Sequence, residues 1–113
     1  MMNKIPFTTL NWSSIEKIEA KGEKGISTSQ TQYFPGLRIR IVEYSAGYLA
    51  DHWCQKGHVI YCLDGEFDSE MESGEVTTLS KGMMYVVSDL LSSHRSTSKN
   101  GATLLIIDGD FLA

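Results

Sequence analysis

The chain has little positive charge and no long hydrophobic run. Its 113 residues carry a net charge of −4 and contain no run of basic residues, which argues against a nucleic-acid footprint or an anionic membrane partner. The apolar runs, such as residues 83–87 and 104–107, are far shorter than the roughly 20 residues that span a bilayer. Residues 1–7 lack the apolar stretch of a signal peptide. We therefore expect a cytoplasmic protein.

Cysteine and histidine are also scarce. Cys54 and Cys62 allow at most one disulfide, and in a reducing compartment two cysteines near histidines are more typical of thiols or metal ligands. The only histidines are His52, His58 and His94, and the first two flank Cys54. A neutral imidazole is the commonest protein metal ligand and a thiolate the commonest soft one. This grouping predicts a metal site.

Turn signals recur at short intervals and predict an all-β fold. Between them lie segments rich in Ile, Val, Thr, Tyr and Phe, so we expect about eight to ten strands. The length predicts one domain over residues 1–113, large enough to bury a hydrophobic core without stabilising disulfides. Residues 13–20 fit either a helix or a strand, and residues 1–24 are expected to pack on or near the barrel. The turn signals are Pro35-Gly36, Asp64-Gly65, Ser73-Gly74, Lys81-Gly82, Asn100-Gly101 and Asp108-Gly109.

The segment from residue 37 alternates as a half-buried strand does. Leu37, Ile39 and Ile41 share one face, and Arg38 and Arg40 lie on the other. Two interpretations of the arginines stay open. They lie on a solvated surface, or they recognise an anion inside the mouth of a barrel, because a guanidinium fork matches a carboxylate.

Residues 52–65 are predicted to form a β-hairpin. Side chains two apart in a strand share a face, so His52 and Cys54 point the same way. Cys54 then lies opposite His58, at the roughly 4.5–5.5 Å that separates the Cβ atoms of paired residues, and His52 lies diagonally on the same face. Such side chains can meet at one ion, because metal–ligand bonds are about 2.0–2.3 Å long.

This region resembles the first motif of the cupin superfamily, in which two histidines flank one residue and a glutamate and a glycine follow. Here His52-x-Cys54, three residues, His58, six residues and Gly65 reproduce the spacing. Residues 82–94 are loosely similar to the second motif, which also ends in a histidine, here His94. More narrowly, residues 51–54 (Asp-His-Trp-Cys) look like the uncharacterised cupins named for an Asp-His-Cys-Trp motif.

The resemblance implies a single cupin-type jelly-roll barrel with a metal site formed by His52, Cys54, His58 and His94. Cys54 stands in place of the second histidine of the family, and His58 in place of its glutamate. Because this exchange softens the ligand set, zinc is the metal most expected, with iron or manganese as alternatives. Four protein ligands would make a structural site. If Cys54 does not bind the metal, three histidines and a water would make a catalytic site.

Plainer interpretations accompany these residues. A single histidine such as His94 also fits a hydrogen-bonded residue of the barrel interior. Cys62 fits a small buried hydrophobe, or it approaches the site on the face of His58. The five tyrosines are expected to pack half-buried with the hydroxyl at a rim.

Three functions stay open. The first is a metal-dependent small-molecule enzyme of dioxygenase or isomerase type, which rests on the habits of the superfamily. The second is a non-catalytic barrel that binds or senses a small ligand and holds a structural zinc. The third is a metal-free protein with a reactive thiol at Cys54. We expect a small-molecule ligand as the partner and a homodimer as the assembly.

Overall fold

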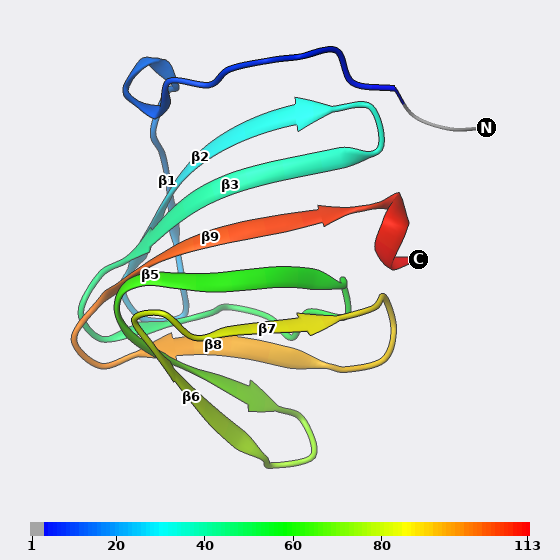
Figure 1. Ribbon diagram of the computed structural model, residues 1–113. Coiled ribbons are helices and arrows are strands. Elements are labelled where there is room, and N and C mark those ends of the chain that lie inside the picture. Colours follow the sequence, from blue (N-terminus) through cyan, green and yellow to red (C-terminus); the bar gives the residue numbers. More distant parts are fainter. Residues whose placement is uncertain (1–3) are drawn as a thin grey trace.

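The structure, a computed structural model, describes residues 4–113 as mostly antiparallel strands (Figure 1). Within these residues there are nine strands and two short 3-10 helices, which confirms the all-β prediction and its strand count. The elements are η1 (Trp12–Ser14), β1 (Ile18–Lys21), β2 (Ile26–Phe34), β3 (Leu37–Tyr44), β4 (Tyr48–Leu49), β5 (His58–Met71), β6 (Val76–Ser80), β7 (Met84–Val87), β8 (His94–Ser98), β9 (Ala102–Gly109) and η2 (Asp110–Leu112).

The strands form two sheets that share the 14-residue strand β5. One sheet has the order β1-β2-β3-β9-β5-β7, and the other has β6-β5-β8-β4. β5 passes from one sheet to the other at an irregularity between Cys62 and Asp64. Gly65 follows directly with a positive φ of 74°, a conformation that glycine adopts without strain because it has no Cβ. A bend at this point lets one strand serve both sheets.

The core lies between the two sheets and follows the period-2 alternation of the strands. In β9, Leu104 and Ile106 are buried and their neighbours are half-buried. Phe67 of β5 and Leu79 of β6 cover the same core from the other sheet. Each such side chain contributes about 1.5–3 kcal/mol by leaving water. The alternation of β9 continues to Asp108, whose carboxylate therefore also faces inward and is buried.

Cys62 belongs to this core and is fully buried. Both Cys62 and Cys54 are free thiols. Cys62 therefore behaves as a small buried hydrophobe, one of the two interpretations that its position allowed.

The N-terminal segment combines a short turn with a strand. Of residues 13–20, the first two belong to η1 and residues 18–20 belong to β1, which pairs with β2. The side-chain amide of Gln30 donates hydrogen bonds to the backbone oxygens of Trp12 and Ile15. These bonds hold η1 against β2. In residues 4–113 no helix is long and apolar enough to cross a membrane.

The predicted hairpin over residues 52–65 is wrong. Residues 50–57 form a loop with a single isolated bridge at Cys54, and the extended strand begins only at His58. The first half of that strand pairs with β7 and β9, not with the preceding residues. Residues 50–57 are therefore irregular backbone and not a strand.

Candidate metal centre

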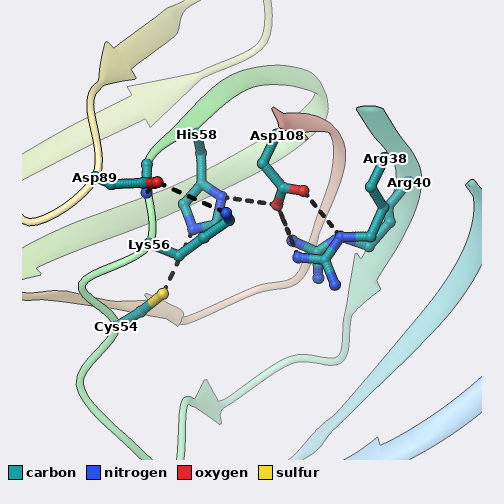
Figure 2. A network of polar contacts seen from close by, with 8 residues as sticks. Arg38, Arg40, Cys54, Lys56, His58, Asp89 and Asp108 are labelled. Atoms are coloured by element: carbon teal, nitrogen blue, oxygen red, sulfur yellow. Dashed lines mark hydrogen bonds and ion pairs between the residues drawn. The ribbon is translucent and has the colours of Figure 1, made fainter. Parts of the chain in front are cut away.

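Cys54, His58 and His94 bring three metal-binding atoms together. The thiol sulfur and one ring nitrogen from each histidine all lie within 4.8 Å of one another. Cys54 Sγ is 3.5 Å from His58 Nε2 (Figure 2). Cys54 lies in the 50–57 loop, whereas His58 begins β5 and His94 begins β8. Three separate segments thus meet at one point, where both histidines are buried.

Backbone hydrogen bonds fix Cys54 opposite His94. Cys54 N donates to His94 O at 2.7 Å, and His94 N donates to Cys54 O at 3.0 Å. Farther along the loop, Gly57 N donates to Oδ1 of Asp89 at 2.6 Å. The loop is therefore tied to β8 and to the segment before it. Cys54 meets His58 for this reason and not as its partner across a hairpin.

His58 is held by its other ring nitrogen. Nδ1 lies 3.2 Å from Oδ2 of Asp108 and donates to that carboxylate, which leaves the lone pair of Nε2 directed at Cys54 (Figure 2). Burial, together with the charge of Arg40, lowers the pKa of His58 to about 4. The imidazole is therefore neutral near pH 7. A carboxylate behind a neutral histidine is the arrangement that orients metal-binding histidines in many proteins.

His94 has a similar arrangement with a hydroxyl. Its Nδ1 is 2.7 Å from Ser92 Oγ, and burial lowers its pKa. Nε2 of His94 is buried and has no hydrogen-bond partner among the described residues. The ring meets the His58 ring edge-to-face, with centroids 5.4 Å apart. An unsatisfied buried nitrogen costs free energy, and it belongs to a histidine that is grouped with a thiol and a second imidazole.

These observations fit a zinc ion. Bond lengths of about 2.3 Å to sulfur and 2.0–2.1 Å to nitrogen at a tetrahedral angle place two ligands roughly 3.5 Å apart, which is the separation of Cys54 Sγ from His58 Nε2. One thiolate and two neutral imidazoles form a soft to intermediate donor set of the kind that zinc prefers. The unpartnered Nε2 of His94 would gain a partner at the same point.

His52, the fourth residue of the predicted ligand set, lies outside this group. Its side chain is 73% exposed, and its Nδ1 is 2.6 Å from the carboxylate of the neighbouring Asp51. It borders the cavity next to the site without joining the other three. The structure therefore brings together three of the four residues, because the loop turns the side chains of Asp51 and His52 toward solvent.

A cavity of about 330 Å³ adjoins the three donor atoms. Its wall includes two tyrosines from different strands of the same sheet, Tyr44 of β3 and Tyr85 of β7. Burial raises the pKa of Tyr44 to about 12 and also raises the pKa of Tyr85. Both phenols therefore stay protonated near neutral pH, so each supplies a polar hydroxyl without charge.

The same cavity receives the two arginines of β3. Arg38 and Arg40 face Asp108, with Arg38 Nη2 2.7 Å and Arg40 Nη2 3.2 Å from its Oδ2 (Figure 2). Their side chains are 31% and 21% exposed, respectively. The interpretation that places them in the barrel mouth is therefore the one that the geometry supports, and the solvated surface is not.

Sequence reasoning missed Asp108 and treated it only as part of a turn. A signal was available in the alternation of residues 102–108. Every second residue of this strand lies on one face, and Asp108 shares that face with the apolar Leu104 and Ile106. A carboxylate at such a position needs partners.

Comparisons with known proteins show the fold. No protein-family model matches the chain, and no curated protein matches it. Among solved structures, the ectoine synthase from P. lautus has 19% identity and a TM-score of 0.74, and the match covers 91% of this chain and 78% of that one. An RmlC-like cupin from Shewanella frigidimarina has 19% identity and a TM-score of 0.69, with 96% and 94% covered. A cupin-superfamily sugar phosphate isomerase from Silicibacter pomeroyi has 14% identity and a TM-score of 0.73, with 90% and 75% covered.

These likenesses confirm the predicted cupin-type jelly-roll barrel. Their sequence identities of 14–19% carry the fold and not the activity, because one fold hosts many chemistries. The narrower resemblance to cupins with an Asp-His-Cys-Trp motif stays a prediction.

Proposed function

We propose that the protein binds a divalent metal ion, zinc in preference to iron or manganese, and acts with it on a small molecule in the adjoining cavity. The observation that carries the proposal is the convergence of three donor atoms from Cys54, His58 and His94, together with a buried Nε2 of His94 that has no hydrogen-bond partner among the described residues. The cavity of about 330 Å³ beside them supplies room for a small substrate.

The chain's own residues would prepare this site before any substrate binds. Asp108 keeps the proton of His58 on Nδ1, and Ser92 holds Nδ1 of His94, so each Nε2 faces inward. Both histidines are buried, so few water molecules compete for their ring nitrogens. A zinc ion held by three protein ligands supplies a Lewis acid and lowers the pKa of a bound water to about 7.

The type of reaction follows from the donor set. Because Cys54 makes the set softer and zinc has no redox chemistry, an isomerase-type reaction is favoured over a dioxygenase-type reaction. The solved structures that share the fold include a protein described as a sugar phosphate isomerase and one described as a synthase. They support small-molecule chemistry as the function class.

The alternative, a non-catalytic barrel with a closed structural zinc, requires a fourth protein ligand. Within residues 4–113 the group of converging donors has three members. His52 points to solvent beside Asp51. The geometry therefore favours a site with one coordination position left open to the cavity.

Metal analysis tests the proposal directly. Protein purified without a metal-affinity column is expected to hold about one equivalent of zinc by mass spectrometry. Cys54→Ser, His58→Gln and His94→Gln are each expected to bind zinc at least about 100-fold more weakly, since even partners behind the ligands are worth 10–100-fold. His52→Gln and Cys62→Ala are matched controls that keep the metal. Zinc retained by all three ligand variants, or absent from the wild type, would contradict the proposal.

Cobalt substitution tests whether a position is open. Cobalt-loaded wild type should show the ultraviolet band of a thiolate ligand, and Cys54→Ser should lack it. Azide should change the visible spectrum if the fourth position is open to the cavity. A spectrum that azide leaves unchanged would favour the closed structural site instead.

A further inference from the structure

Two arginines in the cavity share a single carboxylate. Arg38 donates from Nε and Nη2 to the two oxygens of Asp108 at 2.9 and 2.7 Å, and Arg40 donates from Nη2 at 3.2 Å. Asp108 is almost fully buried, with 3% of its side chain exposed. Since both guanidinium groups stay charged in proteins, this cluster carries one positive charge more than it neutralises.

Arg40 also has a donor to spare. Its Nε is buried and has no hydrogen-bond partner among the described residues. Burial and the charge of Arg38 both lower the pKa of Arg40, as expected of a cation that lacks full compensation. A buried N–H without an acceptor is rare in folded proteins. Arg40 has further N–H donors as well, because it donates to Asp108 from Nη2 alone.

The other cations that border the cavity have partners. Lys56 Nζ is 3.7 Å from the carboxylate of Asp89. Arg95 donates to Glu70 at 2.7 Å and lies over the ring of Trp53, 4.4 Å from its centroid. The uncompensated positive charge is therefore localised at the arginines of β3.

We propose that Arg38 and Arg40 bind the carboxylate of a small organic acid, through guanidinium N–H groups that Asp108 leaves unused. A guanidinium fork matches a planar carboxylate, and the excess positive charge of the cluster attracts an anion. The cavity of about 330 Å³ corresponds to roughly ten waters of liquid volume, so the acid is small.

This inference deepens the proposed function, and rests on it, because it names the substrate class for the same cavity. Asp108 Oδ2 accepts hydrogen bonds from both Arg40 and His58 (Figure 2). A carboxylate bound at Arg40 would therefore be connected through Asp108 to His58, a proposed metal ligand. The remainder of the acid would then face the three donor atoms.

Isothermal titration with malonate tests the subsite, with zinc-loaded and with chelator-treated protein. Malonate is expected to bind the wild type, and Arg40→Gln is expected to weaken the affinity at least tenfold in both forms. Arg40→Lys keeps the charge but lacks the fork, and an intermediate loss of about threefold is expected. The lysine variant also keeps the test valid if Arg40→Gln does not fold. Arg95→Gln is the matched control from the same cavity, and its affinity should stay within twofold of wild type.

Equal affinity in wild type and the Arg40 variants would overturn the inference, as would an equal loss in Arg95→Gln. Inorganic phosphate that binds more tightly than malonate would overturn the choice of a carboxylate. Malonate binding by the chelator-treated protein, combined with no zinc in the wild type, would contradict the proposed metal function alone. Full zinc without malonate binding would contradict this inference alone.

Discussion

At the scale of single residues, Asp108 links the two halves of the site. Its Oδ2 accepts from His58 on one side and from Arg38 and Arg40 on the other. Burial alone would raise the pKa of Asp108, but hydrogen bonds and the positive charges of the arginines lower it below its ordinary value. The carboxylate therefore stays ionised near pH 7 and holds His58 in the tautomer that faces Cys54.

The pKa of His58 predicts how metal-free protein responds to acid. Its ordinary value is 6.5 and its value in the folded protein is about 4, so the unfolded chain binds the proton more readily between those values. Stability is then fully present above about pH 6.5 and falls as the pH drops toward 4. We expect His58 to account for a decrease of about 2–3 kcal/mol in the free energy of unfolding over this pH range. Urea unfolding of chelator-treated protein at a series of pH values measures it.

The matched variant for this measurement is His58→Gln, which cannot titrate. Its unfolding free energy should depend less on pH across the same window than that of the wild type. A residual slope is expected from His94, because burial lowers its pKa in the same direction. Identical slopes in the two proteins would show that His58 is not the group that titrates.

Which site residues could be read from the sequence depends on how each is positioned. The resemblance to the cupin motifs pointed to His58 and His94, and in the structure both begin strands whose alternation fixes the direction of the side chain. His52 lies in a loop, where period 2 does not apply, and its side chain turns outward. Asp108 could not be matched with Arg38 from composition, because their pairing depends on the register between β3 and β9.

At the scale of elements, β5 determines where the site lies. Its first half places His58 beside β7 and β9, and its second half pairs with β6 and β8. The change of sheet needs the positive φ of Gly65, and a Cβ there would overlap the backbone oxygen of Gly101. Strand alternation and turn signals were enough to predict an all-β fold, but no local signal showed that one strand would join two sheets.

Gly65→Ala should therefore destabilise the protein strongly. We expect a loss of about 2–4 kcal/mol, from the strained left-handed conformation and from the overlap with the facing strand. Gly74→Ala is the matched control, because Gly74 also has a positive φ of 104° but has open space around it. It should lose only about 1 kcal/mol. Denaturant unfolding of both variants measures the difference, and equal losses would contradict a special role for the bend.

At the scale of the whole molecule, the candidate metal site connects the two sheets and the 50–57 loop through residues that are not part of the hydrophobic core. His58 lies where β5 pairs with β7 in one sheet, and His94 lies where β8 pairs with β5 in the other. Cys54 comes from a loop that is held by few backbone hydrogen bonds. The hydrophobic core, in contrast, is built without these three residues. The fold should therefore survive without metal, and a bound metal should add stability to it.

Zinc is accordingly expected to raise the Tm of a protein that is already folded without it. A ligand at about 1,000 times its Kd stabilises the native state by about 4 kcal/mol, which for a chain of this size corresponds to a rise of roughly 10 °C or more. Calorimetry of chelator-treated protein with and without added zinc measures the shift. His52→Gln should keep it, and Cys54→Ser should lose most of the shift, because only two of the three protein ligands, the imidazoles of His58 and His94, would remain. If chelator-treated wild type were unfolded, the metal would be needed for folding itself and the structural alternative would gain. If zinc left the Tm unchanged, the three donors would not form a metal site.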